Sequence, residues 1–181
     1  MPSSAADTLE QAKALGANVV MPPMVMENVG TFAYVADPTG AVFALYASAK
    51  DVSDWAPPAA ATPGMFSWHE LASADPDAAW NFYSTLFGWE KTETMDMGDE
   101  GTYQMYGKDG ETWGGIMRKP QDVPMSSWLY YVTVEDIDSA VARVTSHAGQ
   151  VVNGPMEVPG GGRIAHCQDP QGAWFALHQS A

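Results

Sequence analysis

The side chains most able to do chemistry are the four histidines, the single cysteine, and a carboxylate next to one of the histidines. His69 precedes Glu70, and His166 precedes Cys167. Both pairs lie in runs typical of strands, where neighbouring side chains point to opposite faces. His166 and Cys167 are therefore not expected to form a nucleophile pair, and Cys167 is expected to be a small buried side chain. His147 is expected to close a helix, where the helix dipole favours positive charge.

Aromatic side chains form a second candidate surface, suited to binding a ligand. Alternation along strands sends some of them to the core and others to the opposite face, where they could contact a small apolar or aromatic molecule. The candidate ligand-binding residues are Trp68, Tyr103, Trp113, Trp128, Tyr130 and Trp174.

An internal repeat shows which elements position these residues. The nine residues Asp37–Leu45 recur as Asp169–Leu177 at an offset of 132, and seven of the nine are identical. Asp-Pro starts a turn, Gly takes a backbone conformation that other residues resist, and an apolar strand follows. The repeat therefore predicts the same hairpin at the end of two modules.

Helix and strand signals extend the repeat into a β-α-β-β-β module. Asp75 and Pro76 open a helix that Gly88 closes, and similar signals predict helices at 7–16 and 136–149. Strands are expected before the second and third helices, at 65–71 and 128–134, and three more after each of them. The predicted later strands are 89–95, 102–107, 113–117, 150–153, 163–168 and 174–178.

The first copy of the module has no leading strand. The predicted organisation is a partial module at 1–50, a Pro/Ala-rich linker at 51–63, and a complete domain of two modules at 64–181.

Charge and composition exclude several classes of partner. The net charge is −14, and no cluster of Lys or Arg offsets it, so a nucleic acid or an anionic membrane surface is not an expected partner. No apolar run is long enough to span a bilayer. One cysteine excludes an internal disulfide and favours a reducing cytoplasm.

The segments Pro63–Leu71, Asp75–Ala79 and Phe82–Trp89, together with the repeated hairpin, resemble the vicinal oxygen chelate superfamily. This superfamily includes glyoxalase I, bleomycin-resistance proteins and extradiol dioxygenases. The chain resembles its glyoxalase-like two-domain type, truncated at the N-terminus. The resemblance implies an α+β fold in which βαβββ modules pair into a curled mixed sheet around a cavity.

Metal enzymes of this superfamily hold a divalent ion with side chains from the first and last strands of each module. The resemblance places these positions at His69, Tyr130, Ala176 and Ala44, with Gly115 or Met117 on the closing strand of the middle module. Of these residues only His69 is a good ligand.

His178 shares a predicted strand face with Ala176 and could add a second ligand. Glu70 alternates to the face opposite His69. Two histidines without a carboxylate would make a weak site for Zn, Ni, Mn or Fe, so no cofactor is expected with certainty.

Three functions remain open. The first is a metal-free protein of bleomycin-resistance type, which binds a small apolar or aromatic molecule. The second is a metal-dependent lyase, isomerase or dioxygenase in which His69 is the catalytic residue. The third is a non-catalytic assembly module. In each case residues 7–48 expose an apolar sheet face and a strand edge, which predicts a homodimer through this segment.

Overall fold

The computed structural model describes residues 5–52, 54, 56 and 58–181. The first copy of the module contains helix α1 (Ala5–Ala14) and strands β1 (Asn18–Met26), β2 (Gly30–Ala36) and β3 (Val42–Ser48). Among the described residues no strand precedes α1. The predicted linker 51–63 includes residues 53, 55 and 57, which lie outside the described part.

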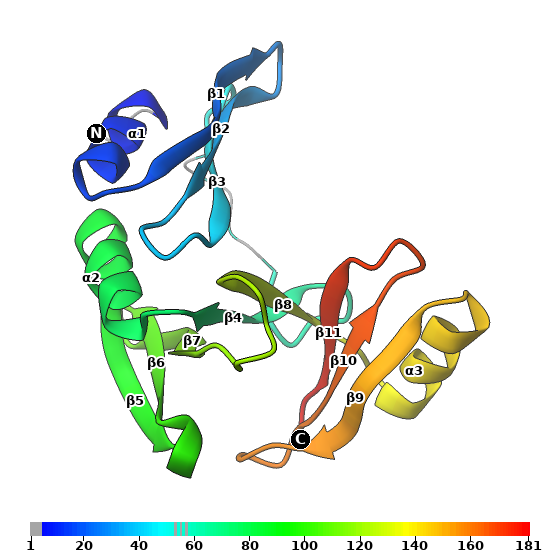
Figure 1. The fold of residues 1–181 in the computed structure, drawn as a ribbon. Coiled ribbons are helices and arrows are strands. Elements are labelled where there is room, and N and C mark those ends of the chain that lie inside the picture. The colour runs from blue at the N-terminus through cyan, green and yellow to red at the C-terminus, as the bar shows by residue number, and fades with distance from the viewer. Residues whose placement is uncertain (1–4, 53, 55, 57) are drawn as a thin grey trace. The chain divides into compact units, whose positions relative to one another are not determined.

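The second and third copies are complete, so the predicted βαβββ repeat and the α+β class are confirmed (Figure 1). The second copy consists of β4 (Phe66–Ser73), α2 (Pro76–Phe87), β5 (Glu90–Asp96), a short 3₁₀ turn η1 (Gly98–Glu100), β6 (Thr102–Lys108) and β7 (Glu111–Arg118). The third consists of β8 (Ser127–Thr133), α3 (Ile137–Ser146), β9 (Gln150–Glu157), β10 (Arg163–Gln168) and β11 (Trp174–Gln179).

Helix α2 begins and ends at the residues that the sequence predicts. The Asp75 carboxylate accepts a hydrogen bond from the Ala78 amide at 3.1 Å, which satisfies one of the unpaired amides of the first turn. Pro76 occupies the first turn, and Gly88 ends the helix with φ of 67°. Asp136 caps α3 in the same way, through the Ser139 amide.

The repeated hairpin also has the predicted turn. Asp37 accepts hydrogen bonds from the amides of Thr39 and Ala41, and Asp169 makes the equivalent two bonds in the last module. Identical residues therefore give identical local structure in both copies.

The chain forms two compact units, which are described separately. Unit 1 comprises residues 1–56 and 71–128, and unit 2 comprises residues 57–70 and 129–181. Strands β4 and β8 each contribute residues to both units. The predicted boundaries at 50 and 64 remain a prediction, as do the curl of the sheet and the cavity.

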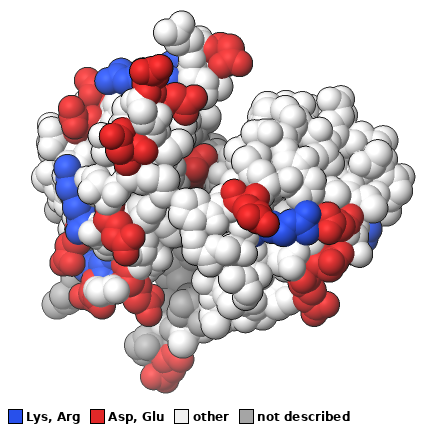
Figure 2. All heavy atoms as spheres, turned by 90° about the horizontal axis from the view of Figure 1, so that it is seen from below, with Lys and Arg blue, Asp and Glu red and all other residues white. Residues whose placement is uncertain are grey.

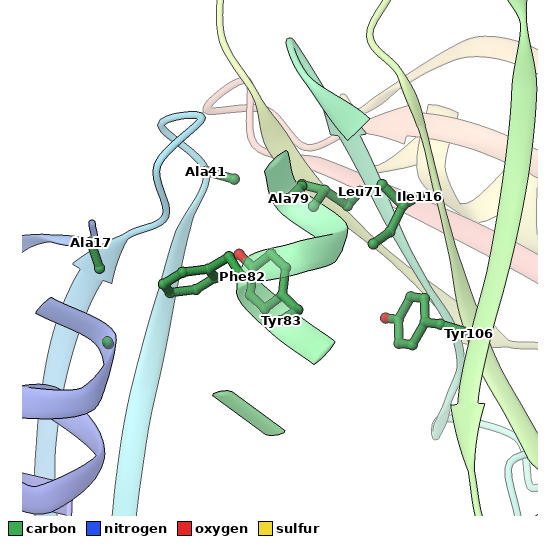
Figure 3. Packing of buried hydrophobic residues seen from close by; sticks show 9 residues of the cluster. Ala17, Ala41, Leu71, Ala79, Phe82, Tyr83, Tyr106 and Ile116 are labelled. Carbon is green, nitrogen blue, oxygen red and sulfur yellow. The ribbon is translucent and has the colours of Figure 1, made fainter. Parts of the chain in front are cut away.

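Unit 1 joins the partial first copy to most of the second copy in one core. Strands β1, β2 and β3 form an antiparallel sheet in that order, and β5, β6 and β7 are neighbours in another. Figure 3 shows Phe82 and Tyr83 of α2 between Ala41 of the first copy and Tyr106 of β6. The Trp89 ring stacks on Tyr106 with a centroid separation of 4.2 Å.

Unit 2 is a four-stranded segment with the order β8-β11-β10-β9. Strand β11 runs parallel to β8 and antiparallel to β10, so the sheet is mixed. Helix α3 packs on one face of it through Ile137 and Ala140, against Ala165, Cys167 and Leu177.

The surface carries the acidic excess of the sequence. In Figure 2 the carboxylate side chains are scattered over the visible face and outnumber the basic ones. None of the described helices is long and apolar enough to cross a membrane.

Candidate functional site

One face of the unit 2 sheet is covered by α3, and the candidate site lies on the other. Along β11 and β10, Leu177 and Cys167 point to α3. Because side chains alternate, Ala176 and His166, which are paired in the register, point to the face opposite α3. Trp174 shares this face with Ala176 and is 54% exposed. We call this surface the α3-opposite face.

Three polar side chains meet on the α3-opposite face. Tyr131 of β8 pairs with Ala176 in the parallel register, so both side chains point the same way. The Tyr131 hydroxyl lies 2.9 Å from Nε2 of His166 and donates to Oε1 of Glu70 at 3.2 Å. Because the one phenolic proton goes to Glu70, the second bond requires His166 to donate from Nε2.

We call these three residues the Glu70–Tyr131–His166 cluster. Tyr131 is only 4% exposed, and burial is the main reason that its pKa is raised far above the ordinary value. The negative charge of Glu70 and the hydrogen bond to it raise that pKa further. The phenol is therefore protonated throughout the neutral range and acts as a fixed hydrogen-bond bridge.

The predicted catalytic residue, His69, lies next to the cluster in sequence but does not take part in the hydrogen bonds described above. Its ring meets the edge of Tyr130 with a centroid separation of 5.4 Å, and burial lowers its pKa. The imidazole is thus held in the neutral form. His69 remains a prediction as the catalytic residue.

The second predicted metal ligand, His178, bonds a side chain of β4. Its Nδ1 lies 2.9 Å from the Ser67 hydroxyl, and burial lowers its pKa as well. That His69 and His178 bind a metal together remains a prediction.

The donor set does not fit a divalent ion of the superfamily type. Within the described ranges, no three His, Cys, Asp or Glu side chains come together so that they could hold a metal. The cluster offers one carboxylate and one imidazole, and a phenol bridges them. Catalytic zinc usually needs at least three protein ligands. Ala176, which lies between Tyr131 and His166 on the same face, supplies none.

The predicted ligand-binding aromatics fall into two groups. Trp113 and Trp128 pack against the unit 1 core, and Tyr103 is 9% exposed. Tyr130 and Trp174 are well exposed in unit 2, and Trp68 is half-buried. Trp128, which is half-buried, also donates from its indole nitrogen to the Tyr83 hydroxyl at 3.1 Å.

Sequence reasoning did not identify Glu70, Tyr131 and His166 as a group. One signal was available, because Glu70 and Tyr131 are 61 residues apart, the same offset that relates His69 to Tyr130. Which of the two pairs points to the α3-opposite face depends on the strand register, because a shift of one residue moves every side chain to the other face.

Comparison with known proteins places the fold in a family. A family model described as the Glyoxalase/Bleomycin resistance protein/Dioxygenase superfamily matches residues 66–177. CFP32 of Mycobacterium bovis, which carries a provisional glyoxylase name, is 29% identical over 170 residues, covering 92% of this chain and 62% of that protein. DnrV of Streptomyces peucetius, named as an anthracycline biosynthesis protein, is 34% identical over 129 residues, covering 64% of this chain and 46% of that protein.

The chain thus spans less than two thirds of the length of these relatives. Among solved structures, the 2,3-dioxygenase LapB of Pseudomonas sp. KL28 matches with a TM-score of 0.65 at 15% identity, over 98% of this chain and 67% of that one. The methylmalonyl-CoA epimerase of Streptomyces coelicolor matches with a TM-score of 0.52 at 19% identity, over 66% of this chain and 96% of that one. At these identities the likeness concerns the fold alone. Because the family model covers more than half of the chain, the chain belongs to the glyoxalase, bleomycin-resistance and dioxygenase superfamily, the vicinal oxygen chelate group that the sequence predicted.

Proposed function

We propose that this chain binds a small apolar or aromatic molecule on the α3-opposite face of unit 2, without a complete metal site. The observation that carries the proposal is the position of the Glu70–Tyr131–His166 cluster on the same face as the exposed Trp174. An apolar surface with a few fixed polar groups is the usual composition of a small-molecule site.

The two parts of this face would do different work. The Trp174 ring offers a flat surface for stacking, which contributes about 0.5–1.5 kcal/mol beyond the area it buries. The cluster offers hydrogen-bonding groups whose geometry is fixed, because Tyr131 is held by both neighbours. A planar ligand with one hydroxyl or carbonyl group fits both parts. That DnrV is named for anthracycline biosynthesis supports an aromatic probe.

The probe we choose is 1-naphthol, with naphthalene as the analogue that lacks the hydroxyl group. Binding is followed by quenching of tryptophan fluorescence in the full chain. We expect Trp174→Ala to weaken 1-naphthol binding at least tenfold. Met125→Ala, which removes a side chain 64% exposed in unit 1, should leave binding unchanged.

A comparison of the two probes tests the role of the cluster. Tyr131→Phe should bring the affinity for 1-naphthol down to that for naphthalene. Equal affinity of both probes for the unmodified chain, or binding that survives Trp174→Ala, would count against this site.

A metal-dependent lyase, isomerase or dioxygenase that uses His69 is the competing proposal. The observation in its favour is that burial keeps His69 neutral, which is the form that binds metals. Elemental analysis of the purified chain separates the two proposals. Stoichiometric Zn, Ni, Mn or Fe that is lost in His69→Ala would overturn the metal-free proposal. No binding of either probe and no metal would favour the non-catalytic assembly module.

A further inference from the structure

Strand β1 carries a group of methionines. Of the 11 methionines in the chain, Met21, Met24 and Met26 lie close together on this one strand. Met24 and Met26 are 46% and 47% exposed. The methionine thioether is polarisable and sits on a flexible side chain, and it serves as a metal ligand as well as a core group.

The pairing of β1 with β2 puts the three thioethers on one face of the sheet. In a regular strand Met21 and Met24, three residues apart, would point to opposite faces. The register shifts between them, however, and the resulting pairs are Met21 with Tyr34, Met24 with Phe32, and Met26 with Gly30. These three residues of β2 are two positions apart and share a face, so the methionines opposite them share it too.

This shared face is the one that points away from α1. Ala33 and Val35 of β2 pack against Leu9 of α1, and the residues that alternate with them point to the other side. Tyr34, on that other side, is 42% exposed. We call this side the outer face of the β1–β3 sheet.

The shift in register belongs to the repeated module, whereas the methionines belong to the first copy. Strand β9 of the last module has the same irregularity, with Asn153 opposite His166 and Met156 opposite Ile164. At the offset of 132, the residues equivalent to Met21, Met24 and Met26 are Asn153, Met156 and Val158. Bulges often redirect side chains next to functional sites, and here the bulge of the first copy gathers three sulfur ligands.

We propose that Met21, Met24 and Met26 bind a Cu(I) ion on the outer face of the β1–β3 sheet. Thioether sulfur is a soft ligand and selects Cu(I) over harder divalent ions. Neighbouring positions on one face of a strand are about 7 Å apart. Met24 is the central member, and its three rotatable bonds let it share an ion with the methionine on either side.

The charges around the methionines favour a soft monovalent cation. Strands β1, β2 and β3 contain no Asp, Glu, Lys or Arg. The outer face therefore has no carboxylate to attract a hard ion and no ammonium group to repel a cation. The net charge of −14 draws cations toward the chain as a whole.

This site differs in ligand type and in ion from the metal pair predicted at His69 and His178. It also lies in unit 1, so the proposal does not depend on ligand binding in unit 2.

A competition titration of the full chain tests the proposal. Cu(I) is kept reduced by ascorbate without oxygen, and the indicator ferrozine competes for it. We expect one Cu(I) ion per chain. Met24→Leu keeps the volume and removes the sulfur. It should weaken Cu(I) binding by more than about tenfold, because losing a ligand costs more than losing an outer-shell partner. Met125→Leu, at a side chain 64% exposed elsewhere in unit 1, should leave the affinity unchanged.

The same variants separate this site from other ligands of Cu(I). The Cys167 thiol and the histidines also attract this ion, but Met24→Leu leaves all of them in place, so a loss of binding assigns the ion to β1. NMR of the chain labelled with methyl-¹³C methionine gives a second readout, with Ag(I) as the probe. The methyl signals of Met21, Met24 and Met26 should shift, and that of Met125 should stay.

Three outcomes would overturn the proposal. The first is a chain that takes no Cu(I) from the indicator, and the second is a folded Met24→Leu variant with the affinity of the unmodified chain. The third is Zn(II) bound as tightly as Cu(I), which would exclude a thioether site. If Met24→Leu does not fold by circular dichroism, Met26→Leu replaces it at the end of the same strand.

Discussion

Removing the hydroxyl of Tyr131 is the most direct test of the Glu70–Tyr131–His166 cluster. Tyr131→Phe keeps the buried ring and removes only the oxygen that lies 3.2 Å from Glu70 and 2.9 Å from His166. A hydrogen bond to a charged group contributes about 1.5–3 kcal/mol, and one between neutral groups about 1 kcal/mol. Water can replace part of both bonds, because Glu70 and His166 are only half-buried. We therefore expect a loss of about 2–3 kcal/mol in the free energy of unfolding.

The pH dependence of this loss gives a second readout. The folded state holds the pKa of Tyr131 above its unfolded value of about 10, so the folded chain keeps the proton when the unfolded chain releases it. The stabilisation that this group contributes is thus complete below pH 10 and declines as the pH rises further. The slope for one proton is at most about 1.4 kcal/mol per pH unit. Tyr131→Phe lacks this slope, so the difference between the two proteins should shrink above pH 10.

Urea unfolding followed by circular dichroism, at pH 7 and between pH 9.5 and 11, measures both effects. Tyr34→Phe is the control, because it makes the same chemical change at a side chain 42% exposed in unit 1. It should change stability by less than about 0.5 kcal/mol. A Tyr131→Phe variant as stable as the unmodified chain at pH 7 would refute the hydrogen-bonded cluster. A difference that grows above pH 10 would refute the assigned role of the buried phenol.

Three further predictions concern other parts of the chain. Asp37→Ala should lower the free energy of unfolding in urea by about 3 kcal/mol, and Asp169→Ala by about 1 kcal/mol. Asp37 is 1% exposed and would lose three hydrogen bonds, whereas Asp169 would lose two in an exposed turn. Equal losses of stability would contradict this difference. Burial lowers the pKa of His69, so the stability that its neutral ring contributes is complete above pH 6.5 and declines as the pH falls. His69→Phe should therefore flatten the acid side of a plot of unfolding free energy against pH. An unchanged plot would count against a buried neutral imidazole. Gly115→Ala should cost about 1–3 kcal/mol in thermal or urea unfolding, because its new methyl group would overlap the Tyr103 ring. Tyr103→Leu in the same chain should recover part of this loss.

Much of the fold could be predicted because its signals are local. Asp75 and Gly88 bound α2 through contacts within one helical turn, and the repeated Asp-Pro-x-Gly turn closes on itself in both copies. Such signals act between residues a few positions apart, so a single sequence carries them in full. The alternation that sends Cys167 to α3 is equally local, and its burial confirms the expectation.

The cluster could not be predicted in the same way because its contacts are distant in sequence. Tyr131 bonds His166 across 35 residues and Glu70 across 61. The superfamily positions predict a functional side chain at His69. The hydrogen bond from Tyr131 is instead accepted by Glu70, the next residue on the strand. Only the strand register determines which of two neighbours reaches a given face.

A second carboxylate can be added beside the Glu70–Tyr131–His166 cluster at one position, Ala176, which permits a constructive test. Ala176 is fully buried between Tyr131 and His166 in the sheet register. Ala176→Glu would add a second carboxylate on the face where Glu70 and His166 both bond the Tyr131 hydroxyl. Two carboxylates with one imidazole suit a divalent ion. Without metal the new buried charge should lower the melting temperature, and Zn or Mn should restore it, since binding to the folded state stabilises it. His166→Ala in the same chain should abolish the restoration. A folded Ala176→Glu variant that takes up no metal by elemental analysis would show that the three side chains do not converge, and would refute the arrangement described for this face.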